Sequence, residues 1–278
     1  MLLAIDIGNT NITIGVFKAD KEPQKKPPAR LSPQSPRAST LVSSWRISTN
    51  ASSTADEYGT KILDLLHYAT IERAQIKAIA IASVVPPLTA VFEDISQKYF
   101  NIKPLIIGQN VKVPILNLYD NPKEVGADRI VNAVAAYARF GGPCIVVDFG
   151  TATSFDCLTK KGEYTGGVIV PGPKLSAESL YLHTAKLPKV EMAKPQRLIG
   201  RNTVESIQSG LYYGYVELVD GLIERLQKEM GSGTKVTATG GLAYVVCQDS
   251  KYVRKDMIVP ELTLEGLSII YEKNSPAA

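Results

Sequence analysis

Residues 1–17 read MLLAIDIGNTNITIGVF, which predicts a strand, a tight turn and a second strand. The apolar run at 2–5 ends at Asp6, and the GNT sequence at 8–10 supplies turn chemistry. Apolar residues then alternate over 12–16, as in a half-buried strand. A carboxylate at a strand end, followed by a Gly/Asn turn, can direct several backbone N–H groups at one anion, and phosphate is the usual candidate.

The same pattern returns half a chain later. Residues 144–158 read CIVVDFGTATSFDCL, with an apolar strand, Asp148, Gly150 and then hydroxyl side chains. Asp6 and Asp148 lie 142 positions apart in a chain of 278 residues. An ordinary hairpin explains either stretch alone. Because the pattern recurs, it indicates a duplicated domain whose two hairpins could grip one polyphosphate.

Composition narrows the class of protein. With 45% hydrophobic and 21% charged residues, the chain can bury a core and fits one large or two ordinary domains. Asp6 interrupts the apolar start, so no signal peptide is expected, and no apolar run reaches the length of a membrane span. The three cysteines form no Cys-x-x-Cys pair. These features predict a reduced, cytoplasmic protein without a membrane partner.

Charge and histidine content exclude further classes. Of the net charge of +4, residues 20–40 carry +3, so the rest of the chain is about neutral and no nucleic-acid-binding face is expected. Only two histidines occur, without a cysteine pair nearby, which argues against zinc. No Gly-x-Ser-x-Gly elbow supports a serine hydrolase.

Residues 20–40 are unlike their surroundings. Five of the 17 prolines fall within 19–40, where almost nothing is apolar. We expect a mobile insertion at a hairpin tip, and a basic docking segment is the alternative.

Strands and helices are expected to alternate in both halves, which gives an α/β class with mixed sheets and two domains, 1–122 and 123–278. A long helix is expected after Asn202 and Glu205, which form a capping pattern. Gly210 and Gly214 lie one turn apart on it and suggest close passage of another backbone. The residues of this helix expected to be buried are Val204, Ile207, Leu211, Leu218, Leu222 and Leu226. Further helices are expected at 53–69, 88–99, 126–141, from 174 and at 262–271, and further strands at 41–48, 77–84, 104–107 and 236–239.

The helix expected at 126–141 opens with GADR. Asp128 and Arg129 fall at its N-terminus. One interpretation is a simple helix cap. The other is an acid/base group beside an anion-binding side chain.

No P-loop or dinucleotide fingerprint accompanies these hairpins. Two Asp-x-Gly hairpins and a late Gly-Gly pair resemble the acetate and sugar kinase, Hsp70 and actin superfamily. Within it, the chain closely resembles the type III pantothenate kinases. The resemblance implies two duplicated actin-like (ribonuclease H-like) domains around an interdomain cleft. It rests on DIGNTN (6–11), Tyr119, GADR (126–129), DFGTATS (148–154), GGVIVPG (166–172) and RNT (201–203), and departs clearly only at 20–40.

The resemblance also implies a reaction and roles for residues. The reaction is ATP-dependent phosphorylation of pantothenate, with Asp128 as the general base. Asp148 is implied to bind a monovalent cation, K⁺ or NH₄⁺, and Asp6 to lie near Mg²⁺. The residues implied to bind ATP are Asp6, Ile7, Gly8, Asn9, Thr10, Asn11, Ile12, Thr13 and Thr151. Those implied to bind pantothenate are Tyr119, Gly126, Ala127, Asp128, Arg129 and Thr203.

The family resemblance further implies a homodimer in which the partner's 166–172 loop completes the pantothenate pocket. Two alternatives remain. One is a different small-molecule kinase or a phosphatase of the same superfamily, which pantothenate-dependent ADP release would distinguish. The other is a non-catalytic regulatory relative, which would be expected to lack Asp6, Asp128 or Asp148, whereas all three are present.

Overall fold

The chain forms two compact units. The computed structural model describes residues 1–19 and 39–275. The first unit comprises Met1–Arg139 and Leu262–Ala278, and the second comprises Phe140–Glu261. The insertion predicted at 20–40 lies almost entirely outside the described residues.

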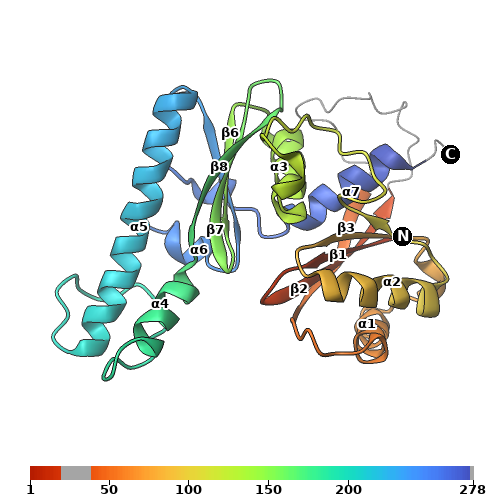
Figure 1. The fold of residues 1–278 in the computed structure, drawn as a ribbon, viewed down its shortest axis with the longest axis horizontal. Helices are drawn as coiled ribbons and strands as arrows, with labels where there is room; N and C mark the ends of the chain where they lie inside the picture. Colours follow the sequence, from red (N-terminus) through yellow and green to blue (C-terminus); the bar gives the residue numbers. More distant parts are fainter. Residues whose placement is uncertain (20–38, 276–278) are drawn as a thin grey trace. The chain divides into compact units, whose positions relative to one another are not determined.

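A five-stranded mixed sheet forms the centre of the first unit (Figure 1). Its order is β3-β2-β1-β4-β5, in which β1 pairs antiparallel with β2 and parallel with β4. The strands are β1 (Leu2–Ile7), β2 (Asn11–Ala19), β3 (Ser39–Ser48), β4 (Ala78–Ser83) and β5 (Leu105–Ile106). The helices are α1 (Ala55–Tyr68), α2 (Pro86–Phe100), α3 (Ala127–Phe140) and α7 (Leu262–Asn274), with short 3₁₀ turns at Arg73–Gln75 and Pro122–Glu124.

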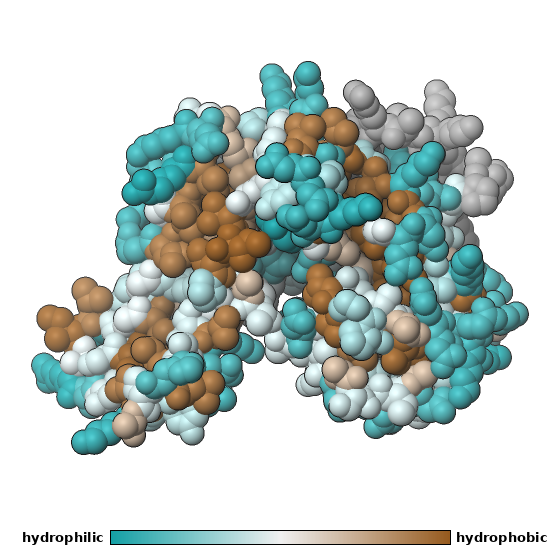
Figure 2. Space-filling model, in the orientation of Figure 1, coloured by the Kyte–Doolittle hydropathy of each residue, from teal (hydrophilic) through white to brown (hydrophobic). Residues whose placement is uncertain are grey.

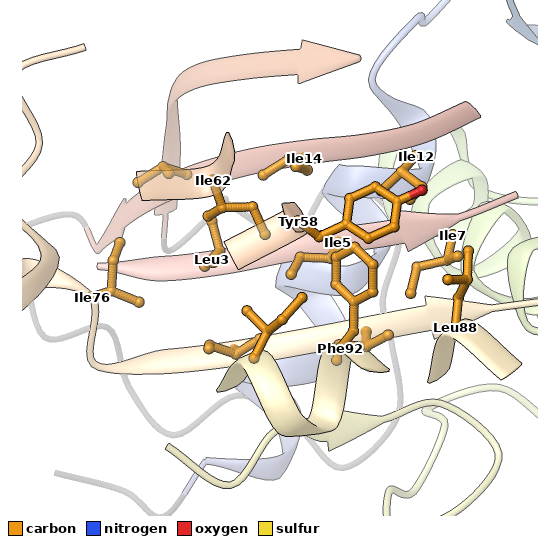
Figure 3. Packing of buried hydrophobic residues seen from close by; sticks show 14 of the residues in the cluster. Leu3, Ile5, Ile7, Ile12, Ile14, Tyr58, Ile62, Ile76, Leu88 and Phe92 are labelled. Carbon is orange, nitrogen blue, oxygen red and sulfur yellow. The ribbon is translucent and has the colours of Figure 1, made fainter. Parts of the chain in front are cut away.

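The first hairpin is buried on both faces of this sheet. Ile12 and Ile14 of β2 lie in a core with Tyr58 of α1 and Phe92 of α2, as Figure 3 shows. On the opposite face, a Cβ added to Gly15 would lie 2.8 Å from Leu264 Cδ1 of α7. The two-residue alternation of β2 therefore separates the side chains that face α1 and α2 from those that face α7.

The second unit is built on a four-stranded mixed sheet with the order β8-β7-β6-β9. Its strands are β6 (Cys144–Phe149), β7 (Ala152–Leu158), β8 (Tyr164–Pro171) and β9 (Lys235–Gly240). Its helices are α4 (Pro173–Leu182), α5 (Thr203–Met230) and α6 (Ala243–Val246), with a 3₁₀ turn at Lys255–Met257. One face of the sheet packs with buried residues of α5 and α6 in a single hydrophobic core.

The two sheets repeat one pairing pattern, as a duplication predicts. β6 pairs antiparallel with β7 and parallel with β9, just as β1 pairs with β2 and β4. Asp6 is in register with Thr13 of the following strand, and Asp148 with Ser154. Each aspartate thus occupies the same place in its sheet, one residue before the end of the central strand.

The helix cap predicted at Asn202 is confirmed, and the helix expected from residue 53 is capped as well. Thr54 caps α1 by accepting from the N–H of Glu57 at 3.3 Å. Asn202 caps α5 by accepting from the N–H of Glu205 at 2.9 Å. The segment 166–172 was expected to be a loop, but residues 164–171 extend the sheet as strand β8.

The buried stripe predicted for α5 is wrong. The helix buries a neighbouring face that includes Tyr212, Tyr215 and Val219, while Val204 and Leu218 are 47% and 37% exposed. Gly210 and Gly214 were expected to meet another backbone. No atom of the described chain lies within 4 Å of the Cβ that either would carry, the helix's own backbone within four residues aside. The helix is apolar on two faces, and hydrophobic periodicity cannot tell which of them the sheet covers.

The first part of unit one extends to Arg139, whereas the end of the first domain was expected at residue 122. α3 lies almost wholly in the first unit, and α7 returns to it from the end of the chain. α7 contacts β1, β2 and β4. A Cβ on Gly266 of α7 would lie 2.2 Å from the carbonyl oxygen of Val131 in α3. This packing joins segments far apart in sequence, and local composition carries no signal of it.

Candidate active site

In the first unit, the first Asp-x-Gly turn joins β1 to β2. Asp6 lies near the carboxyl end of β1, and the N–H of Gly8 donates to the carbonyl of Asn11 at 3.0 Å. Thr49 fixes the same turn, because its hydroxyl donates to the carbonyl of Gly8 at 2.7 Å and its N–H to Thr10. Asn9 and Thr10 are exposed at the tip. Hydrogen bonds from Thr49 therefore hold the turn in place while its tip is exposed to solvent, as an anion-binding loop requires.

The GADR segment lies beside this turn. The N–H of Val84, directly after β4, donates to the carbonyl of Ile7 at 3.0 Å. Val84 also lies 3.5 Å from the position of a Cβ on Gly126. The structure thus brings Gly126 and the start of α3 to the carboxyl ends of β1 and β4, where Asp6 lies.

Asp128 is a partly buried carboxylate in the first turn of α3. Its Oδ1 accepts from the N–H of Arg129 at 2.8 Å, and a Cβ on Gly126 would be only 2.6 Å from this oxygen. Burial raises the pKa of the Asp128 carboxyl, although the Arg129 N–H and guanidinium act in the opposite direction. A carboxyl whose pKa is raised by desolvation is suited to accept a proton, and Gly126 leaves room for it.

A cavity of about 390 Å³ lies within the first unit at the residues that directly precede Asp128, although Asp128 itself does not line it. Gly126 and Ala127 line one side, Ser83 and Val84 another. The remaining wall comes from residues 107–130 and includes Ile107, Val113, Ile115, Asn117 and Ile130. Tyr119 follows this wall, and its N–H donates to Asn117 Oδ1 at 3.0 Å. The volume and the mixed apolar and polar lining are typical of a pocket for a small molecule.

In the second unit, Asp148 occupies the equivalent position at the end of β6. Ser154 and Thr239 are its register neighbours on β7 and β9. Gly240 has a φ of +93°, and a Cβ there would lie 2.7 Å from Asp148 Oδ1. Glycine is required at this position both for its backbone conformation and for the close approach to the carboxylate.

Thr153, one of the hydroxyl residues that follow Gly150, does not lie on the same side of the sheet as Asp148. It is opposite Phe149 in the sheet, so it faces the α5 side rather than the side of Asp148. Its Oγ1 lies 2.5 Å from the hydroxyl oxygen of Tyr215 in that core. Ser154 faces the side of Asp148, and its hydroxyl donates to Asp156 Oδ2 at 2.8 Å.

Thr151 and Thr203 lie at separate places in the second unit. Thr151 is in the exposed turn between β6 and β7, and its carbonyl accepts from the N–H of Gly172 at 3.0 Å. Thr203 is the first residue of α5 and lines a hollow with Arg201, Asn202 and Leu180.

Two supporting side chains were not found from the sequence. Thr49 holds the first turn and Tyr215 contacts the second hairpin. Neither lies in a motif, and each acts on residues at least 39 positions away. Among residues 1–19 and 39–275, no three His, Cys, Asp or Glu side chains gather as a metal-binding group. Within the same residues, each helix is too short or too polar to cross a bilayer.

Two mixed sheets, each with an aspartate near the end of an inner strand, define the class of actin-like proteins with a ribonuclease H-like fold. Two solved structures share this fold. The activator of 2-hydroxyisocaproyl-CoA dehydratase from Clostridium difficile with bound ADPNP matches with a TM-score of 0.52 at 12% identity, over 98% of this chain and 94% of that one. The ethanolamine utilization protein EutJ from Carboxydothermus hydrogenoformans matches with a TM-score of 0.51 at 13% identity, over 96% and 89%.

Sequence comparison identifies the family within this class. The model of the type III pantothenate kinase family matches residues 2–225. The type III pantothenate kinase of Myxococcus xanthus is 47% identical over 274 residues, which is 99% of both chains. That of Geobacter sulfurreducens is 46% identical over 99% of both chains. The chain belongs to the type III pantothenate kinase family.

Proposed function

We propose that Asp128 is the general base with which this kinase transfers the γ-phosphoryl group of ATP to pantothenate, the first step of coenzyme A biosynthesis. The observation that carries the assignment is the partly buried carboxylate in the first turn of α3, with its raised pKa, directly after Gly126 and Ala127, which line a cavity of small-molecule size. A solvated helix cap would not need this burial.

In the proposed reaction, the primary hydroxyl oxygen of pantothenate attacks the γ-phosphorus of ATP. Asp128 takes the hydroxyl proton, the bond between the γ-phosphorus and the bridging oxygen breaks, and ADP leaves with that electron pair. The products are 4′-phosphopantothenate and ADP. Phosphoryl transfer depends on positioning and charge neutralisation more than on covalent catalysis, so backbone N–H groups of the first turn other than that of Gly8, together with the Arg129 guanidinium, would offset the developing charge.

For pantothenate, we propose contacts with Tyr119, with Gly126 to Arg129 and with Thr203. The cavity beside Gly126 supports the first two assignments, because it is lined by Gly126, Ala127 and the segment that precedes Tyr119. Thr203 is supported by its exposed position at the N-terminus of α5.

For ATP, we propose contacts from Asp6 through Thr13 and from Thr151, with Mg²⁺ near Asp6. Mg²⁺ in such enzymes usually keeps several waters and is held by one or two carboxylates and the phosphates of the substrate. The site fits this requirement, because Asp6 supplies one carboxylate and lies opposite the hydroxyl-bearing Thr13. The metal would neutralise charge on the phosphates.

For Asp148, we propose a bound monovalent cation, K⁺ or NH₄⁺. The residues fit such an ion: one carboxylate, the hydroxyl-bearing Ser154 and Thr239 as register neighbours, and a glycine where a Cβ would crowd the carboxylate. A single negative charge among neutral oxygens suits a weakly hydrated monovalent cation better than Mg²⁺. The ion would supply positive charge near the second hairpin.

We propose that the kinase is a homodimer and that α5 lies in its interface. Gly210, Gly214 and Leu218 are exposed, and their spacing of four residues aligns them along one face of the helix. Val204 in the first turn is exposed as well. Figure 2 shows hydrophobic residues gathered on the second unit, in the part of the view where Figure 1 places α4, α5 and β8. A helix that is apolar on two faces and buries only one against its own sheet is suited to pack against a second copy.

We also propose a cytoplasmic location. All three cysteines are buried, and none forms a disulfide among the described residues. Cysteines of this kind are typical of proteins in a reducing compartment.

The decisive experiment is an ADP-release assay with purified protein, Mg²⁺ and K⁺. Pantothenate should raise ADP release at least tenfold, whereas acetate or glucose should leave it at the background rate. A response to acetate or a sugar, with none to pantothenate, would favour a different kinase of the same superfamily. Absence of ADP release with every acceptor would favour a non-catalytic relative.

A further inference from the structure

Tyr215 connects three segments of the second unit through one buried hydroxyl. Its oxygen lies 2.5 Å from Thr153 Oγ1 at the start of β7 and 3.0 Å from the carbonyl oxygen of Pro171 at the end of β8. Tyr215 is 6% exposed and Thr153 is fully buried. A phenol has one proton and a carbonyl oxygen can only accept, so both contacts are satisfied when Tyr215 donates to Pro171 and accepts from Thr153.

The segments that Tyr215 joins flank the turn at Gly150 and Thr151. Gly172, which follows Pro171, donates its N–H to the carbonyl of Thr151. A Cβ on Gly172 would lie 2.3 Å from that oxygen and 2.4 Å from the carbonyl oxygen of Gly150. The start of α4 is therefore packed directly on the backbone of the turn, and anything that shifts Pro171 shifts this packing.

The ring of Tyr215 is anchored as well. Its centroid lies 6.4 Å from that of Phe149, the residue between Asp148 and the turn. The side chain thus contacts the hairpin at Phe149 and at Thr153, immediately before and after the turn. These positions are fixed from the α5 side of the sheet, opposite to the side that Asp148 faces.

We propose that Tyr215 is a positioning residue for nucleotide binding: its hydroxyl holds the Gly150–Thr151 turn against the start of α4 in the geometry that receives the phosphates of ATP. The inference rests on the proposed role of Thr151 at the phosphates. Tyr215 itself does not touch the nucleotide. Its hydroxyl acts through Thr153 and Pro171, which are left without this partner when it is removed.

Tyr215→Phe tests the proposal, with Tyr212→Phe as a matched control. Tyr212 lies one turn earlier on α5 and is equally buried, but its hydroxyl donates to Asp249 Oδ2 at 3.0 Å, away from the hairpin. Each variant removes one hydroxyl from a buried tyrosine of the same helix. Both should therefore lower the melting temperature by a similar few degrees.

The two variants should differ in nucleotide binding. For Tyr215→Phe we expect the Kd of ADP, measured by calorimetry with Mg²⁺ and K⁺, and the KM for ATP to rise about three- to tenfold, the range of one net hydrogen bond. The KM for pantothenate and kcat should stay within about twofold. Tyr212→Phe should leave all four values at those of the wild type.

Thr153→Val removes the same hydrogen bond from its other partner, so the proposal can be tested even if Tyr215→Phe folds poorly. It should weaken ADP binding to a similar extent, and the double variant should be no weaker than the weaker single variant, because both changes remove one shared interaction. Equal ADP affinity in Tyr215→Phe, Thr153→Val and the wild type would overturn the proposal, as would a wild type that does not bind ADP. A wild type that binds ADP but does not respond to pantothenate would instead refute the proposed function, and the comparison of ADP affinities would remain decisive for Tyr215.

Discussion

Gly126→Ala moves the proposed base without changing its chemistry. The added methyl carbon would lie 2.6 Å from Asp128 Oδ1, which is about 0.8 Å short of the 3.4 Å at which ordinary contact begins. The next neighbouring atom outside Asp128, Val84 Cγ1, is at 3.5 Å and need not move. The carboxylate, as the end of a side chain, must therefore give way by most of an ångström, while the backbone around it can stay in place.

Displacement of a catalytic group by about 1 Å can cost about 100-fold in rate, so we expect kcat to fall between about 10- and 100-fold. The melting temperature should change by no more than a few degrees, because no backbone atom is displaced. The assay is steady-state ADP release at saturating ATP and pantothenate. Gly233→Ala is the control, since among the described residues no atom beyond its chain neighbours lies within 4 Å of its added Cβ. A well-folded Gly126→Ala variant with kcat within twofold of the wild type would refute the placement of Asp128 as the base.

Three further predictions address the base, the cation and the dimer. Asp128→Asn should lower kcat by about two to four decades, while its melting temperature at neutral pH stays equal or rises. Burial raises the pKa of Asp128 in the folded protein above its ordinary value. Ionisation of Asp128 therefore lowers the free energy of unfolding increasingly as the pH rises from the ordinary aspartate pKa to the raised one. Asparagine does not ionise, so the variant avoids this loss of stability. The acid limb of the wild-type pH profile of kcat should lie above the ordinary aspartate pKa for the same reason, and a limb at or below it would contradict the assignment. Activity with excess Mg²⁺ should need K⁺ or NH₄⁺, and Asp148→Ala should abolish the response to these ions. Full wild-type activity with Na⁺ as the only monovalent metal ion would instead favour Mg²⁺ as the ion that Asp148 binds. Leu218→Asp should weaken the dimer at least tenfold by light scattering, while Tyr68→Asp, at an exposed position on α1, should leave it intact; a wild-type monomer at micromolar concentration would disprove the interface.

Several parts of the fold and the site could be predicted from the sequence. The alternation of apolar residues over 12–16 predicted β2, because a strand between two packed layers must separate its side chains by face. The capping residue Asn202 predicted where α5 begins, because exposed helix N–H groups need a local acceptor. The equal positions of Asp6 and Asp148 were visible as a repeated motif, because turn chemistry is local.

Other features were decided only by the tertiary structure. The sequence of α5 has two apolar faces, and only packing on the sheet selected the face with Tyr215 and left Leu218 exposed. The return of α7 to β1 could not be predicted either, since its contacts join the two ends of the chain.

The same limit applies to the side chains that support the site. The sequence named Asp128, but its burial, the raised pKa and the closeness of Gly126 arise from packing around α3. Thr153 lies within a motif, yet strand alternation turns it towards Tyr215 and away from Asp148. Motifs and turns are encoded by neighbours in the chain, whereas desolvation, close approach and hydrogen bonds between distant segments exist only once the sheets and helices have packed.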